Sequence, residues 1–142
     1  MPLYQSEKII RIVFPAILLL ALSQNASVQA TWASHRVRTG MTVSEALQIS
    51  GDWTWGHAYS ERPTPEPAVS LSFNQRVVQV PGQDHSQNFA SLDGVAEALA
   101  QQMAGHAWRM SLTYIGMPRP SFAVSFDPQG KVQSVSGISL AD

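Results

Sequence analysis

Histidine side chains can bind a metal ion or transfer a proton, so they are the first candidates for chemistry in this sequence. The sequence contains four: His35, His57, His85 and His106. None stands two to five residues from another, and there is no cysteine, so a local zinc motif is absent. If two halves of the chain are related by symmetry, His57 and His106 could meet in space. The sequence therefore leaves open a small periplasmic hydrolase or metal-dependent enzyme that uses these two residues.

Hydrolysis also requires a nucleophile that faces a base. Ser60 precedes Glu61, and His85 stands between Asp84 and Ser86, but residues adjacent in sequence do not face one another. The strained Gly-x-Ser-x-Gly turn and the glycine-rich phosphate loop are both missing. We therefore expect no enzyme, with no catalytic residues, no metal site and no cofactor.

Aromatic residues give a different kind of candidate, a binding surface built from Trp53, Trp55 and Tyr59. Trp53 and Trp55 are two residues apart, which places both on the same face of a strand. If that face is exposed it forms a binding patch, because aromatic residues dominate recognition surfaces. If it lies beneath helices it belongs to the core, as we expect for Trp108. The sequence leaves both readings open for Trp53 and Trp55.

The first thirty residues have the three parts of a secretory signal peptide. Lys8 and Arg11 precede an almost wholly apolar run of eleven residues, and Val28 to Ala30 supplies small residues where a signal peptidase cuts. The run is shorter than the about 20 apolar residues of a membrane-spanning helix, which disfavours an uncleaved anchor. We expect residues 1–30 to be a cleaved leader and residues 31–142 to form one periplasmic or secreted domain without a membrane span.

Composition narrows the class of protein further. Hydrophobic residues make up 44% of the 142 residues and charged residues 13%, as in an ordinary globular domain. The formal net charge is -1, without the basic surface that nucleic-acid binding requires. The lack of cysteine excludes disulfides, thiol chemistry and a lipid-modified cysteine. We expect no nucleic-acid partner.

The sequence after the leader contains an internal repeat. The pattern Pro-x-Pro-x-x-Ala-Val-Ser begins at Pro63 and again at Pro118, with a tyrosine four residues before each. Similar helix and strand patterns flank both copies in the same order, as expected of a duplicated unit. We therefore predict two pseudo-repeats, at about 41–80 and 91–136, within the single domain.

Each copy begins with a short amphipathic helix. Thr42 with Glu45 three residues later forms a capping box, and Gly51 closes a helix of barely two turns. In the second copy Ser91 is a suitable N-cap for a longer helix whose apolar stripe ends at Met103. Both helices need an apolar surface to cover.

Three strands follow each helix. Apolar residues at 110, 112 and 114 alternate with Arg109, Ser111 and Thr113, so one face of this strand is apolar. Segments 69–73 and 122–126 alternate in the same way, and turn residues lead each into another strand, as in a hairpin. We predict an α+β fold in which two helix-strand-strand-strand repeats form one antiparallel sheet with the helices packed on one face.

The second copy resembles a PepSY-type domain. The likeness rests on the helix opened by Ser91, Leu92 and Asp93, the strand from Trp108 to Tyr114, and the segment from Phe122 to Val132. Such domains occur in tandem, in an arrangement similar to the beta-lactamase-inhibitor-protein-like fold. The first copy departs from this pattern, because its helix is short and its turn is Asn74–Gln75.

The resemblance implies a non-catalytic binding role in the cell envelope, such as inhibiting or chaperoning peptidases. No catalytic residues are defined for such domains, so none is carried over to this chain. We therefore expect an exported, periplasmic binding module that holds a protein partner of the envelope through the region of Trp53, Trp55 and Tyr59.

Overall fold

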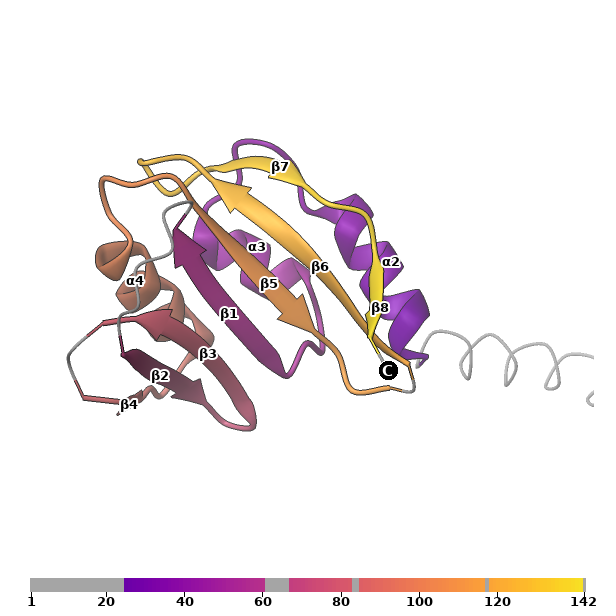
Figure 1. Ribbon diagram of the computed structural model, residues 1–142, viewed down its shortest axis with the longest axis horizontal. Helices are drawn as coiled ribbons and strands as arrows, with labels where there is room; N and C mark the ends of the chain where they lie inside the picture. Colours follow the sequence, from indigo (N-terminus) through magenta and orange to yellow (C-terminus); the bar gives the residue numbers. More distant parts are fainter. Residues whose placement is uncertain (1–24, 61–66, 83–84, 117, 142) are drawn as a thin grey trace, which may run out of the picture.

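The computed structural model describes residues 25–60, 67–82, 85–116 and 118–141. Within them the chain forms an α+β fold with three helices and one sheet of eight strands (Figure 1). The helices are α2 (Ala26–Arg36), α3 (Val43–Ile49) and α4 (Leu92–Gln102). The strands are β1 (Trp55–Ser60), β2 (Ala68–Phe73), β3 (Arg76–Pro81), β4 (Gln87–Asn88), β5 (Trp108–Thr113), β6 (Arg119–Phe126), β7 (Val132–Val135) and β8 (Ser139–Ala141).

The caps predicted for α3 and α4 are confirmed. The Thr42 hydroxyl accepts a hydrogen bond from the Glu45 backbone N–H at 3.1 Å and donates one to the Glu45 carboxylate at 3.1 Å. The Ser91 hydroxyl accepts from the Gly94 N–H at 3.1 Å. These bonds satisfy backbone groups that have no partner within the helix, so both helices begin where the sequence places them.

Two predicted hairpins are also confirmed. β2 pairs antiparallel with β3, and β6 pairs antiparallel with β7. The β2–β3 turn places Asn74 at a φ of 56°, a backbone conformation that asparagine adopts more readily than most residues. The first half of the proline motif's first copy, residues 63–66, lies outside the described residues.

The sheet is mixed, so the prediction of a wholly antiparallel sheet is wrong. Its strand order is β4-β2-β3-β1-β5-β6-β7, with β8 also paired to β6. β1 runs parallel to β3, and β2 runs parallel to β4. The reason is the place of the β2–β3 hairpin. β3 inserts between β2 and β1, and because the chain reverses twice, from β1 to β2 and from β2 to β3, β3 runs in the same direction as β1.

The order of helix and three strands occurs twice along the chain, but the strand neighbours differ. β5, β6 and β7 lie side by side in chain order, whereas β3 lies between β1 and β2. Helix α2 and strands β4 and β8 are additional to the predicted elements. The sheet therefore joins the two segments through antiparallel pairing of β1 with β5 at its centre.

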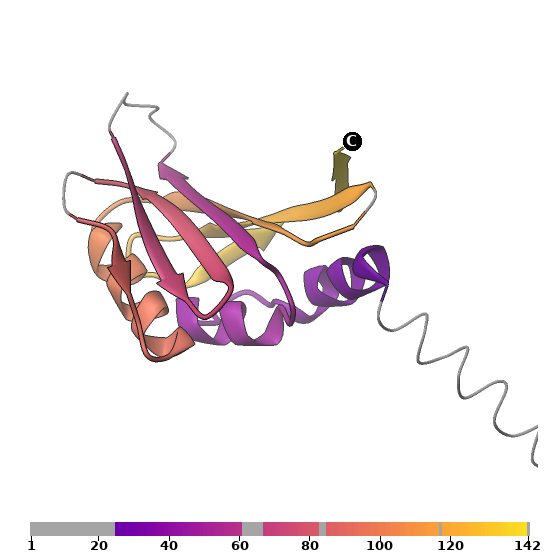
Figure 2. The same cartoon turned by 90° about the horizontal axis from the view of Figure 1, so that it is seen from below.

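Helices and sheet form two layers. Figure 2 shows α2, α3 and α4 on the same side of the sheet, and no helix of the described residues lies on the opposite side. α3 contacts α4, α4 contacts β2 and β3, and α2 contacts β6. No helix in the described part of the chain is long and apolar enough to cross a membrane.

The core lies between the two layers and is rich in large side chains. The Trp108 and Phe126 rings stack with their centroids 4.3 Å apart, and Trp108 is buried as expected. Core-facing residues of β5 and β6 alternate with residues that face away from the helices. This alternation leaves one face of the sheet apolar and covered and the other face open.

Candidate functional site

Three rings lie in a row along β1 on the open face of the sheet. These residues, Trp55, His57 and Tyr59, form what we call the ring row. The Trp55 and His57 ring centroids are 6.1 Å apart, and those of His57 and Tyr59 are 5.5 Å apart. Trp55 is 45% exposed, His57 is exposed and Tyr59 is half-buried. The row is thus a continuous aromatic surface in contact with solvent.

The alternation of β1 explains why the three rings share a face. Gly56 and Ala58 stand between them and point toward the core. A Cβ added at Gly56 would lie 3.2 Å from the Val78 side chain, so this position leaves little room on the core side. Large residues on one face and very small ones on the other therefore hold the strand in one orientation.

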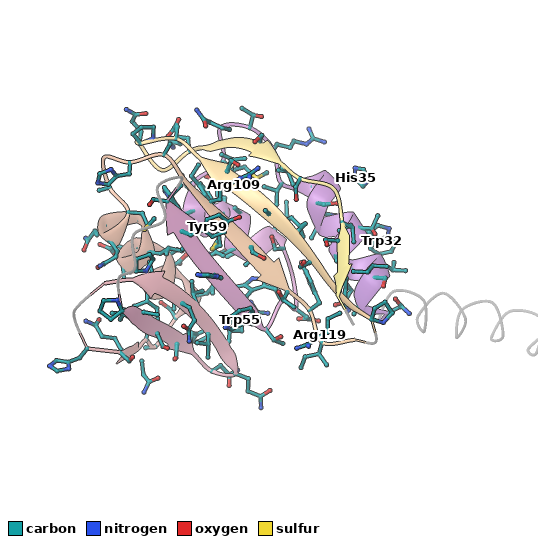
Figure 3. The ribbon with its side chains drawn as sticks, viewed as in Figure 1. Trp32, His35, Trp55, Tyr59, Arg109 and Arg119 are labelled. Atoms are coloured by element: carbon teal, nitrogen blue, oxygen red, sulfur yellow. The ribbon has the colours of Figure 1, made fainter. Side chains whose placement is uncertain are left out.

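β1 lies between β3 and β5, so the ring row runs along the middle strand of the sheet (Figure 3). Directly paired residues share a face in a sheet. On the β5 side the partners of the ring row, all polar, are Thr113, Ser111 and Arg109. On the β3 side the partners of Trp55 and His57 are Val77 and Gln79. The rings are therefore flanked mainly by hydroxyl, amide and guanidinium groups.

Arg109 adds a positive charge beside the ring row. It is exposed, and its Nε donates a hydrogen bond to the Ser125 hydroxyl on β6 at 3.0 Å. Arg109 pairs in register with Tyr59, so the two residues stand side by side on this face, and the hydrogen bond to Ser125 directs the guanidinium group toward β6 (Figure 3). The sequence placed Arg109 on the polar side of its strand without assigning it a role. Only the register of β5 against β1 brings it to the ring row.

Trp53 does not belong to this surface. Its side chain has no exposed area, and its indole N–H donates a hydrogen bond to the Leu47 carbonyl of α3 at 2.9 Å. The Arg76 guanidinium lies over its ring at 5.2 Å from the centroid. Trp53 precedes β1, so the two-residue spacing from Trp55 does not place the two rings on one face. The structure assigns it to the core, the second of the two readings.

Tyr114 is buried beside the same end of α3. Its hydroxyl donates a hydrogen bond to the Ser50 carbonyl, and its ring stacks on Phe122. Burial raises the pKa of the Tyr114 phenol above its usual value, and the nearby Arg76 charge acts in the opposite direction. Tyr114 is thus a structural donor.

The structure does not bring His57 and His106 together. His57 lies on the open face of β1, whereas His106 is exposed in the turn before β5. The end of β1 nearest His106 is Ser60, three residues or about 10 Å of strand from His57. Among the described residues no three His, Asp or Glu side chains gather in a group that could hold a metal ion.

A shallow cavity of about 410 Å³ lies between α3, α4 and the turn from β6 to β7. Across it the Ser44 hydroxyl of α3 donates to the Asp93 carboxylate of α4, and the nearby Gln48 side chain donates to the same carboxylate at 2.6 Å. These bonds tie the two helices together. We therefore interpret the cavity as part of the packing interface between α3 and α4.

Comparisons with protein-family models, with curated proteins and with solved structures find no match to this chain. The resemblance of residues 91–132 to PepSY-type domains therefore stays a prediction. What the site can do has to be argued from the geometry of the open face.

Proposed function

We propose that this protein is an exported, non-catalytic binding module of the cell envelope, and that the open face around the ring row holds a protein partner. The observation that carries this proposal is the position of the row. Its three rings, two of them exposed and that of Tyr59 half-buried, lie on the sheet face that no described helix covers. The role can be that of a peptidase inhibitor or of an envelope accessory protein.

The residue types of this face support a protein interface. Trp, Tyr and Arg carry most of the binding energy in such interfaces. Here Trp55 and Tyr59 share one face of β1, and Arg109 is paired with Tyr59. Small polar residues surround them, including Ser111 and Thr113. A centre of aromatic side chains with a polar rim is the usual anatomy of a binding patch.

The strand register supports a rigid surface. β1 is hydrogen-bonded on both sides, to β3 and to β5, so the backbone under the rings is held in place. A preorganised surface loses little conformational entropy when a partner binds. The ring row can therefore meet a partner without rearrangement of the sheet.

The finer architecture belongs to the same proposal. We interpret residues 41–80 and 91–136 as diverged copies of one PepSY-like unit, with the order of helix and three strands kept in both. The hairpin of the first copy then changed its place beside β1. In this interpretation the ring row belongs to the first copy and Arg109 to the second, so the binding surface depends on both.

The test is a double substitution, Trp55→Ala with Tyr59→Ala. The immobilised protein is used to capture partners from a periplasmic extract, and the affinity for the captured protein is then measured by calorimetry. Removal of two central aromatic residues should weaken binding about 30-fold or more, which corresponds to a hot-spot loss of about 2 kcal/mol. Circular dichroism should show an intact fold.

Trp32→Ala is the matched control. Trp32 is 50% exposed, close to the value for Trp55, but it lies on α2 (Figure 3), which Figure 2 shows on the other side of the sheet. This variant should bind the partner like the parent protein. Equal weakening by both changes, or parent-like binding by the double variant, would contradict a binding role of the open face.

A further inference from the structure

Helix α2 is packed into the described domain. Ala30 has no exposed surface and Ala33 is 3% exposed, and the helix contacts β6. Figure 2 shows α2 in the same layer as α3 and α4, under the end of the sheet that carries β8. The small residues on one side of α2 allow its backbone to come close to the sheet. α2 therefore covers part of the core.

The first turn of α2 fits closely against the loop between β5 and β6. A Cβ added at Gly116 would lie 2.9 Å from the Ala26 Cβ, closer than side-chain atoms can approach. The helix also has its own N-cap, because the Asn25 side chain accepts a hydrogen bond from the Ser27 N–H at 2.9 Å. Both features lie upstream of Ala30.

A cut after Ala30, as the small residues from Val28 predict, would divide this helix. It would remove the Asn25 cap, the Ala26 contact and the buried Ala30 side chain. Only residues 31–36 of the helix would remain, a length at which a helix is unstable in water. The domain would lose one of its three described covering helices.

We propose that the leader is cut upstream of α2, after Ser23, and that α2 belongs to the mature protein. Ala21 and Ser23 place small residues two apart directly after the apolar run, which is the pattern that a signal peptidase reads. Water adds across the Ser23–Gln24 peptide bond, leaving a carboxylate on Ser23 and an amino group on Gln24. The proposal rests on export of the chain and is independent of what the open face binds.

The retained helix adds a surface to the mature protein. Trp32 is half-exposed on α2, and the Arg36 guanidinium lies 5.9 Å from its ring centroid. This pair, together with His35 at the last turn, would not be held in helical geometry in a chain that began at Thr31.

The test expresses the full chain with its own leader in a bacterium that has a periplasm. The intact mass of the periplasmic protein, measured under denaturing conditions, gives the first residue whether or not a variant folds. We expect the mature chain to begin at Gln24. A mature chain that begins at Thr31 or at any other residue, or a chain that keeps Met1, would overturn the proposal.

Two matched substitutions separate the two candidate cuts. Ser23→Gln puts a large side chain at the last leader residue and should abolish the product that begins at Gln24. Val28→Gln spoils the alternative motif in the same way and should leave that product unchanged. Persistence of the Gln24 product in Ser23→Gln, or its loss in Val28→Gln, would also overturn the proposal.

Discussion

Two aromatic side chains of the core, Trp53 and Tyr114, donate hydrogen bonds to carbonyls at the C-terminal end of α3. These carbonyls have no partner within a helix and would otherwise be buried without one. α3 has only seven residues, too few to be stable alone. The two rings therefore stabilise the helix both by packing and by satisfying its last carbonyls.

Tyr114→Phe tests this role because it removes the hydroxyl and keeps the ring. The Ser50 carbonyl should lose its donor while the stacking on Phe122 stays. We expect the free energy of unfolding in urea to fall by about 1 to 3 kcal/mol. Tyr59→Phe on the open face is the control and should change it by less than about 0.5 kcal/mol. Equal losses in both variants would show that the hydroxyl of Tyr114 has no special role.

The raised pKa of Tyr114 predicts a pH dependence. The phenol ionises in the unfolded chain at about pH 10, whereas burial keeps it neutral in the folded protein at that pH. The stability it provides is complete below pH 10 and is lost as the pH rises above that value. Urea midpoints between pH 8 and pH 11 should therefore fall more steeply for the parent protein than for Tyr114→Phe. Parallel curves would contradict this assignment.

At the level of elements, α2 and β1 pack against their neighbours through small residues. Ala30 and Ala33 face β6 from α2, and Gly116 leaves room for Ala26 at the end of the same helix. On β1, Gly56 and Ala58 allow close packing under the ring row. Close approach at these points fixes where each element lies, so an added methyl group should displace it.

Gly116→Ala tests the attachment of α2. The new Cβ would lie 2.9 Å from the Ala26 Cβ, so the helix or the loop must move, at a cost of about 1 to 3 kcal/mol. We expect a lower melting temperature and faster hydrogen exchange of the α2 amides. Gly137→Ala is the control, because a Cβ there meets no atom within 4 Å. Unchanged exchange in α2 would show that this contact does not hold the helix.

At the scale of the whole molecule, the three described helices form one layer on one side of the eight-stranded sheet, and no described helix covers the opposite side. The central strands β1 and β5 come from different halves of the chain, and their pairing aligns Tyr59 with Arg109. The candidate binding surface is therefore a property of the assembled sheet. A single half would contain either the ring row or its arginine.

The sequence by itself determined the local structure of this protein. The helix caps at Thr42 and Ser91 depend on hydrogen bonds between residues three apart. The apolar stripe of α4 and the two hairpins likewise depend on patterns within one segment of the chain. The alternation along each strand likewise separated its two faces.

Only the tertiary structure decided which neighbours those segments have. β3 inserts between β1 and β2, and Trp53 is buried under Arg76, so both contacts join residues far apart in the chain. The packing of α2 on β6 also crosses the boundary at residue 30 that the leader motif predicts. Strand pairing has the same local pattern whichever strand lies beside it, so the global fit of the core selects the order. That selection placed the ring row on the open face.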